Sequence, residues 1–547
     1  MEIAGKEMKI VTLDHLGIVA ATCKDLGLEE KINTRLHSND PRRIVSPGKA
    51  ILAMILNGLG FSNRRLYLTP QFFQNKPVEK LLGPELEAKH IDDHTLGKAL
   101  DEIAAYGVTN FFGELAFSIA QEQGLLSNTA HNDTTSFSFE GAYDGEDEAE
   151  IVKIMHGYSK DGRHDLKQIV MNLVTTGRAG IPLWMAPKNG NATDVKSLQE
   201  TIVAVKKFQK GFKIEHDFRW TMDAAWYCEA NIQNSGKTKW LSRVPEKIKS
   251  AKTLTELSDK SIVWQSLGNG YKIFESETDY GNVAQRWVLV HSEQANTRES
   301  KTFLKNLDKK MDELKKSLWH LGNELFTCEK DATKSLAAVK KKHPYFIVSH
   351  AAEAIRKHKG RGRPQVEALP EIVGYKIKAD FVDNAEEIAL KLSTKGRFIL
   401  ATNDMDTTHF PAKNILEEYK AQQQVERGFR FLKDPWFMAD TFYLKTPERI
   451  SALMSVMALC LMVYNIAQYR FRESLAKSDE TIPNQINKPA KNPTLRWIFQ
   501  MMEGINIVKF YDKNMRLIKE IIANFDELRQ KIIKHFGKTA MLIYGIA

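Results

Sequence analysis

The chain is poor in cysteine, and the four cysteines that it has lie far apart. Cys23, Cys228, Cys328 and Cys460 form no C-x-x-C pair in a chain of 547 residues. Disulfide frameworks and structural zinc sites both need several cysteines at short spacings. The sequence therefore predicts neither a zinc finger nor a disulfide-stabilised fold, and it fits the reducing environment of the cytoplasm.

Long apolar runs are scarce as well. The N-terminus, MEIAGKEMKIVTLDHLG, lacks the apolar region of a signal peptide. One stretch, residues 450–468, is just long enough to span a bilayer, but Ser451, Ser455 and Asn465 interrupt it. We interpret it as a buried core helix and expect no membrane association.

Apolar residues and positive charge are both present in quantity. Hydrophobic residues make up 43% of the chain, which is ample for a core, and the length predicts several domains or one large domain with an insertion. The net charge of +10 suits a polyanionic partner. Charge alone does not separate a nucleic-acid-binding protein from a ribosome-associated or merely basic one.

The pattern along the chain predicts helices first and alternating strands and helices afterwards. Residues 1–125 are expected to be helical, with Ser46-Pro47 opening one helix and Asp93 capping another that ends at Gly107. Residues 167–176 and 181–186 predict a hairpin, and residues 194–209 predict a helix. Further strands are expected at 271–276, 285–292, 345–349, 375–382 and 397–404, with a lysine-rich helical run at 297–342 between them.

Three acidic residues stand at positions that suit chemistry. Asp133 lies within a predicted strand at 126–139, and Asp223 ends a short predicted strand that we expect to run directly into a helix. Active sites of α/β sheets lie at such strand ends. Each aspartate alone is more often a helix cap or a turn residue, so the interpretation depends on the set of three in this order. The third acid, Glu426, belongs to the segment 419–433.

That segment, YKAQQQVERGFRFLK, predicts an amphipathic helix. At 100° per residue, Tyr419, Gln422, Glu426 and Lys433 fall within about 60° of one another. A neighbouring stripe of apolar residues can anchor the helix on a core, and it consists of Val425, Phe429 and Leu432. A solvated helix face is the alternative interpretation.

Taken together, these segments resemble the DDE transposases of bacterial insertion sequences, in the branch with the signature Y-x2-R-x3-E-x6-K. Its positions are occupied here by Tyr419, Gln422, Glu426 and Lys433. The segments HNDTTSFSFEG (131–141), GYSKDGRHDLKQIV (157–170), PKNGNATD (187–194) and WTMDAAW (220–226) resemble the other family blocks, in order. Gln422 replaces the arginine of the family, and Arg430 lies nearest to it on the same helix face.

The resemblance implies an α/β fold. An RNase H-like catalytic core is interrupted by a β-rich insertion with a helical arm, and an N-terminal helical domain and C-terminal helices flank the core. The expected divisions are an end-binding helical domain at 1–125, the core at 126–245 and 396–475, the insertion at 246–395, and a linker with helices, including one at 512–536, at 476–547. A purely structural role for the N-terminal helices is the alternative.

The resemblance also implies the activity. The enzyme cuts DNA at the terminal inverted repeats of an insertion sequence, and the freed 3′-OH then attacks target DNA. Asp133, Asp223 and Glu426 would hold two Mg²⁺ or Mn²⁺ ions, since such hard ions prefer carboxylates. The expected setting is a bacterial or archaeal cytoplasm at the nucleoid, with a homodimer assembled on DNA. The predicted DNA contacts are Tyr419, Gln422, Arg430, Lys433, Arg361 and Arg363.

Three alternatives remain open from the sequence. Arg361 and Arg363 belong to a basic segment, 356–364, that either enters an A·T-rich minor groove or is a solvated loop. The alternatives to a transposase are a non-catalytic DNA-binding relative and an RNase H-like nuclease without strand transfer. If Glu426 is not the third ligand, the candidates are Glu417, Glu418 and Asp404.

The departure at Gln422 gives a first prediction. A neutral amide cannot match the bidentate, charge-assisted grip of arginine on a phosphate. We expect Gln422→Arg to preserve or raise the rate of DNA cleavage, and Arg430→Ala to lower it more than an average surface change does. Loss of cleavage in Gln422→Arg together with no effect of Arg430→Ala would mean that Gln422 has a role of its own.

Overall fold

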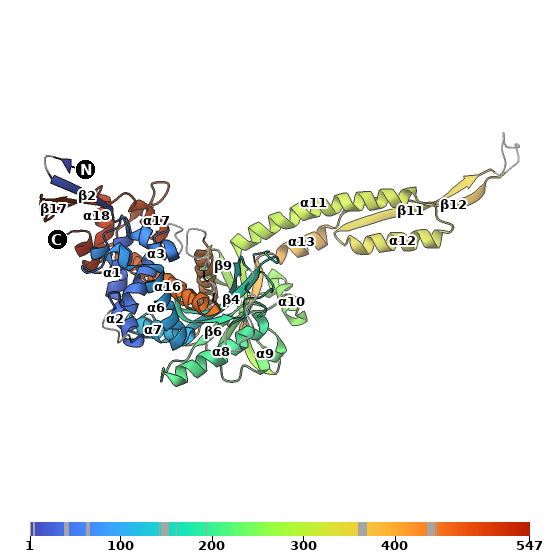
Figure 1. Ribbon diagram of the computed structural model, residues 1–547. Coiled ribbons are helices and arrows are strands. Elements are labelled where there is room, and N and C mark those ends of the chain that lie inside the picture. Colours follow the sequence, from blue (N-terminus) through green and yellow to red (C-terminus); the bar gives the residue numbers. More distant parts are fainter. Residues whose placement is uncertain are drawn as a thin grey trace. The chain divides into compact units, whose positions relative to one another are not determined.

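In a computed structural model the chain forms two compact units (Figure 1). Unit 1 contains residues 1–226, 234–241 and 417–547, and unit 2 contains residues 227–233 and 242–416. The structure describes residues 2–546 apart from 4–5, 38–42, 62–65, 142, 144–151, 160, 193, 359–368, 435–443 and 445. The five domains that the sequence predicts remain a prediction.

The helices expected in the N-terminal part of unit 1 are present. Ser46 caps α3 (Pro47–Leu59) by accepting a hydrogen bond from the amide of Lys49, as its position before proline suggests. Helix α6 (Asp93–Tyr106) is capped by Asp92 and not by Asp93, so that prediction is wrong by one residue. The other helices here are α1 (Leu16–Asp25), α2 (Leu28–Arg35), α4 (Thr69–Phe73), α5 (Val78–Leu81) and α7 (Val108–Glu122).

These helices pack around α16 (Pro447–Ser478), which contains the apolar stretch. Among the described residues, α16 is the one helix long and apolar enough to cross a membrane, besides the α6–α7 pair, which is bent by 90°. In its most apolar window, 89% of α16 is buried. Its neighbours include α1, α3, α6 and α7, so its interpretation as a core helix is confirmed.

The two ends of the chain form a sheet that the sequence did not predict. Its order is β1 (Glu2–Ile3), β2 (Lys6–Thr12), β16 (Asn506–Tyr511) and β17 (Leu517–Ala523). The expectations of an all-helical 1–125 and of a helix at 512–536 are therefore wrong. Asp512 accepts hydrogen bonds from the amides of Asn514 and Arg516 and turns the chain into a β16–β17 hairpin. Helix begins later, at α18 (Glu527–Lys534) and α19 (Lys538–Ile543).

Four strands of a second, larger sheet lie in unit 1, in the order β5-β4-β3-β6. Strands β3 (Thr129–Phe139), β4 (Lys167–Thr176) and β5 (Ile181–Lys188) are antiparallel, whereas β6 (Arg219–Met222) is parallel to β3. The predicted β4–β5 hairpin and the helix α8 (Asp194–Gly211) are confirmed. Both faces of β4 are buried, because nine of its ten residues are buried.

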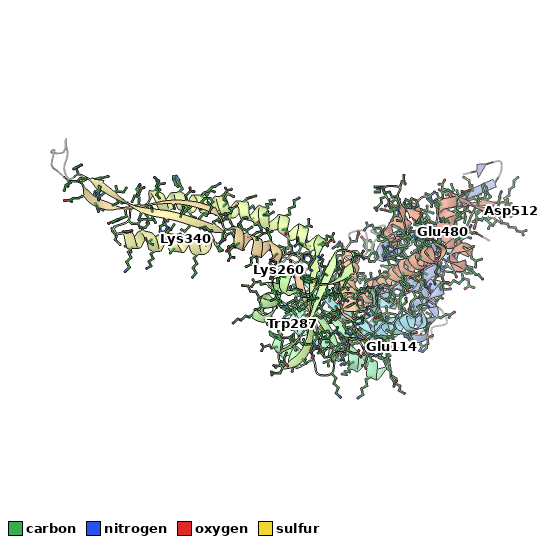
Figure 2. The ribbon with its side chains drawn as sticks, turned by 180° about the vertical axis from the view of Figure 1, so that it is seen from behind. Glu114, Lys260, Trp287, Lys340, Glu480 and Asp512 are labelled. Atoms are coloured by element: carbon green, nitrogen blue, oxygen red, sulfur yellow. The ribbon has the colours of Figure 1, made fainter. Side chains whose placement is uncertain are left out.

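Unit 2 contains an antiparallel sheet of β8 (Gln265–Gly268), β9 (Tyr271–Tyr280), β10 (Val283–Ser292) and β13 (Arg397–Thr402). Trp287, labelled in Figure 2, lies on β10. The guanidinium of Arg286 is buried in this unit. It pairs with Glu275 at 2.8 Å and donates to the carbonyls of Asp404 and Phe410, which fixes the segment after β13.

An arm within unit 2 has a core of its own. Helices α11 (Glu293–Asn323) and α12 (Glu329–Lys342) lie along the hairpin of β11 (Phe346–Lys357) and β12 (Glu371–Asp383) (Figure 1). Leu307, Leu314 and Leu321 recur every seven residues on α11 and are buried in that core. The predicted continuous run at 297–342 is wrong at 324–328, where the amide of Phe326 bonds to Tyr375 instead.

The arm core gives a second prediction. Leu314 is fully buried, whereas Leu304 on the same helix is 46% exposed. Leu314→Ala should destabilise the arm by about 2–5 kcal/mol, because it leaves a cavity. Leu304→Ala, the same change on a solvent-facing side, should cost far less. Urea unfolding followed by hydrogen exchange of α11 and α12 would measure both, and equal losses would contradict this packing.

Candidate active site

Asp133 lies near the middle of β3, on a rigid element of unit 1. Its carboxylate accepts a hydrogen bond from the amide of Thr134 at 2.7 Å, and the side chain is half-buried. Side chains alternate along a strand, so His131, Asp133 and Thr135 belong to one face of the sheet.

Asp223 follows the last residue of β6, the strand parallel to β3. The register pairs His131 with Thr221, and two further residues along each strand bring Asp133 level with Asp223 on the same face. Adjacent strands lie about 4.8 Å apart. Asp133 and Asp223, which are 90 residues apart in sequence, each stand two positions beyond the last pair of this ladder.

Asp223 is exposed and its carboxylate shapes the turn after β6. One oxygen accepts hydrogen bonds from the amides of Ala225 at 3.0 Å and Trp226 at 3.2 Å. The helix expected directly after Asp223 is absent, because this turn intervenes and α9 (Glu229–Gln233) starts six residues later. The turn fixes the backbone of Asp223 while its side chain stays open to solvent.

Glu426 is exposed in the first turn of α15 (Gln423–Leu432). The predicted apolar stripe is confirmed, since Val425, Phe429 and Leu432 are all buried. Helix α15 packs against β3 and α16. The stripe therefore holds the helix on the sheet that carries Asp133.

The segment 419–433 is not one continuous helix. Helix α14 (Ala412–Ala421) ends before Gln422, and α15 begins after it. The amide of Gln422 bonds to Tyr419, and that of Val425 bonds to Gln422, both three residues back. Gln422 keeps helical backbone angles, φ −55° and ψ −32°, so the chain passes through a tightened helical turn here. The expectation of one continuous helix is wrong at Gln422, and the shared face of the four signature residues stays a prediction.

The three acids do not form a closed cluster. Within the ranges that the structure describes, no three His, Cys, Asp or Glu side chains gather as a metal-binding group. Asp133 and Asp223 share a sheet face, and Glu426 is presented separately by α15. Their hard carboxylate oxygens fit Mg²⁺ or Mn²⁺, because such ions are bound through one or two carboxylates with other positions left to water and phosphate.

The predicted DNA contacts have different surroundings. The ammonium of Lys433 lies 2.5 Å from a carboxylate oxygen of Asp161. Arg430 is exposed, and Tyr419 and Gln422 are half-buried. Arg361 and Arg363 lie outside the described residues. Lys433 is thus already neutralised by a carboxylate when DNA is absent.

Glu418 is held by contacts that the sequence does not predict. Its two carboxylate oxygens accept hydrogen bonds from Arg219 at 3.1 Å and from Thr221 at 3.3 Å, both on β6. Its neighbour Glu417 pairs with Arg178 instead. The alternation Arg219, Thr221, Asp223 on one strand face was the available signal, but it does not identify a partner 197 to 199 residues away.

His131 also escaped notice, although it is fully buried on the face of Asp133. Burial lowers its pKa from 6.5 to about 4. A histidine with this pKa is neutral at physiological pH. It therefore adds no positive charge beside the acids.

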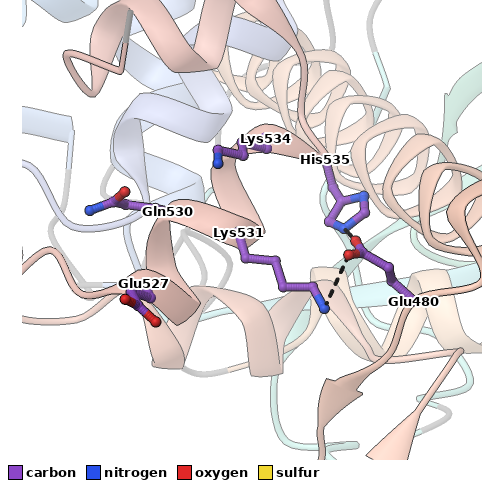
Figure 3. Close-up of a pocket in the computed structure, with 6 residues that line it drawn as sticks. All are labelled: Glu480, Glu527, Gln530, Lys531, Lys534 and His535. Atoms are coloured by element: carbon purple, nitrogen blue, oxygen red, sulfur yellow. Dashed lines mark ion pairs between the residues drawn. The ribbon is translucent and has the colours of Figure 1, made fainter.

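A hollow of about 600 Å³ in unit 1 lies elsewhere (Figure 3). Its lining residues are Glu480, Glu527, Gln530, Lys531, Lys534 and His535. Glu480 pairs with His535 at 2.7 Å and with Lys531 at 3.5 Å, as the dashed lines show. Its lining contains no predicted site residue, so the candidate site is the sheet face and not this hollow.

Comparison with known families decides what these acids belong to. Residues 132–463 match the family described as "Transposase DDE domain", which is more than half of the chain. The chain belongs to this transposase family. All three acids lie within the matched range, and the family generally uses divalent metal ions. The protein is thus a DNA transposase by family.

The other comparisons say little more about the function of this transposase. Residues 8–117 match a domain of unknown function, DUF4277, and no curated protein matches the chain. Among solved structures, a cryo-EM structure of the piggyBac transposase synaptic complex with hairpin DNA is similar at 10% identity. It covers 89% of this chain and 80% of that chain with a TM-score of 0.34. Likeness at that score carries no argument here.

The ion pair of Lys433 gives a third prediction. DNA phosphate must displace Asp161 to reach Lys433, so Asp161→Asn should tighten binding to duplex DNA by about two- to fivefold, in keeping with an exposed ion pair worth under 1 kcal/mol. Asp165→Asn is the matched control, because Asp165 pairs with Arg163 in the same loop and the change in net charge is identical. Equal tightening in both variants, measured by fluorescence anisotropy, would show only the effect of net charge.

Proposed function

We propose that Asp133, Asp223 and Glu426 form the catalytic carboxylates of a bacterial insertion-sequence transposase. The enzyme would cut DNA at the terminal inverted repeats and join the freed 3′-OH to target DNA. One observation carries the proposal: the β3–β6 register makes Asp133 and Asp223 neighbours on one sheet face, inside the matched transposase domain.

The strand order supports an RNase H-like core for this transposase. Three antiparallel strands, β3 to β5, are followed by β6, which is parallel to β3 and lies on its other side. Strand β3 has a hydrogen-bonded strand on each side, so Asp133 is carried by a rigid backbone. The end of β6 then presents the second acid beside it.

The acids and Lys433 would have different roles in cleavage. When bound, two divalent ions would relieve the charge on the attacking and leaving oxygens of the phosphodiester. Asp133 and Asp223 supply oxygens from a fixed sheet, and Glu426 supplies another from α15. Lys433, at the end of α15 and about 10 Å from Glu426 along a helix, would hold a flanking phosphate.

Glu426 has to approach the aspartates for this chemistry. It is exposed on α15, and only Gln422 separates α15 from α14, so the junction is the place where α15 can turn. We infer that DNA and metal together draw α15 over the sheet face. Catalysis would then depend on assembly of the DNA complex, for which a homodimer holding two transposon ends is the expected form.

The other parts of the chain have proposed roles in binding. The N-terminal helices coincide with the separately matched range 8–117, which supports a domain of its own that would bind the inverted repeats. The insertion between the second and third acids would add contacts outside the cleavage site. We place the protein at the nucleoid of a bacterial or archaeal cell, because its substrate is DNA.

Isosteric changes of the acids give a fourth prediction. Asp133→Asn, Asp223→Asn and Glu426→Gln should each lower cleavage of inverted-repeat DNA at least a hundredfold, while end binding stays within a fewfold, because the acids hold metal and not DNA. Asn at position 223 keeps the acceptor for the turn amides of Ala225 and Trp226, so lost activity would not reflect a broken turn.

The same assay tests the metal requirement and carries its control. Cleavage should need Mg²⁺ or Mn²⁺ and stop with EDTA, and Ca²⁺ should support binding with little cutting. Asp217→Asn removes an exposed acid just before β6 and should cleave normally. Wild-type rates in Glu426→Gln would reject Glu426 as the third acid, and full activity after chelation would reject the metal-dependent mechanism.

A further inference from the structure

We propose that Glu418 is a positioning residue that anchors the signature helices to the strand leading to Asp223 and thereby sets where Glu426 lies. The inference rests on the proposed function of Glu426 as the third acid. Glu418 would not touch the metal or the DNA itself. Its effect would pass through α14 and the Gln422 junction to α15.

Two side chains of one strand hold the carboxylate of Glu418. One oxygen of its carboxylate accepts from the guanidinium of Arg219 at 3.1 Å, and the other accepts from the hydroxyl of Thr221 at 3.3 Å. Arg219, Thr221 and Asp223 alternate along β6 and its end, so they share a face. The carboxylate therefore joins α14 to the face of the sheet on which Asp133 and Asp223 are neighbours.

Burial makes this anchor firm. The side chains of Glu418 and Arg219 are only 8% and 17% exposed. Removing one member of a buried ion pair leaves the other charge unpaired in a poorly solvated place, which is strongly unfavourable. Displacement of α14 from β6 would have the same cost, so the pair restrains the helix as well as the strand.

Distances along the two elements make the anchor relevant to Glu426. From Arg219 to Asp223 the strand advances about 13 Å at 3.3 Å per residue. From Glu418 to Glu426 a helix advances about 12 Å at 1.5 Å per residue. Helix α15, which continues from this anchor, packs on β3, the strand next to β6, so the anchored helices lie on the sheet that carries Asp133.

The same contacts argue against Glu418 as a metal ligand. Both oxygens already accept hydrogen bonds, and the guanidinium of Arg219 neutralises the carboxylate. A metal ion would have to displace Arg219 and leave its charge buried. The geometry thus assigns Glu418 to the group of outer residues that orient ligands and tune metal affinity.

The test compares Glu418→Gln with Glu114→Gln. Glu114 is a close match, because it pairs with Arg35 at 3.5 Å, accepts a hydroxyl hydrogen bond from Tyr106 and is 15% exposed. It joins helices α2 and α7 and lies on neither β3 nor β6. Thermal unfolding, binding of inverted-repeat DNA and cleavage against Mn²⁺ concentration would be measured for both variants and the wild type.

We expect Glu418→Gln to raise the Mn²⁺ concentration for half-maximal cleavage about tenfold or more, the usual effect of losing an outer partner of a metal site. DNA-end binding should stay within a fewfold. Glu114→Gln should lower the melting temperature without moving the Mn²⁺ requirement. Thr221→Val removes one hydrogen bond and keeps the ion pair, so it should raise the Mn²⁺ concentration for half-maximal cleavage by less. This variant also tests the inference if Glu418→Gln does not fold.

Three outcomes would overturn the inference. An unshifted Mn²⁺ requirement in Glu418→Gln and Thr221→Val would remove the positioning role, and an equal shift in Glu114→Gln would reduce it to general stability. Loss of cleavage at every Mn²⁺ concentration in a folded Glu418→Gln would make Glu418 a ligand. Failure of the wild type itself to show metal-dependent cleavage would instead reject the proposed function.

Discussion

The parallel pairing of β3 and β6 is the constraint on which the candidate site depends. Parallel strands need a crossover connection, and the chain between β3 and β6 supplies it through β4, β5 and α8. The ladder ends with His131 opposite Thr221, and Asp133 and Asp223 each stand two positions beyond that pair. A slip of one residue would move one aspartate to the opposite face. Burial of the apolar side chains of this sheet therefore also fixes the relative placement of two acids.

The third acid depends on a weaker kind of restraint. Glu426 is 203 residues from Asp223 in sequence, yet both belong to unit 1, so the insertion separates them only along the chain. Its helix is held by the apolar stripe on β3 and α16 and, through α14, by the buried pair of Glu418 and Arg219. In the proposed site, the sheet supplies two carboxylates and α15 supplies the third.

The local patterns were predictable from sequence, and the non-local pairings were not. The β4–β5 hairpin, the α3 cap at Ser46 and the buried face of α15 each follow from residues close together in the chain. No proline or glycine indicates the break between α14 and α15 at Gln422. The partners of Glu418 lie about 200 residues away, and adjacent aspartates at 92 and 93 offered two equivalent caps. No local pattern could decide these points.

The pairing of β2 with β16 has a consequence for folding during synthesis. Lys9 lies opposite Lys509, so the ladder joins residues 500 positions apart. Contacts of such separation form late, because the intervening chain must first be made and ordered. A ribosome that has not yet released the last part of the chain leaves β2 as an unpaired edge, open to wrong partners. This ladder is thus completed only after β16 has been synthesised, and a product truncated before β16 would lack it.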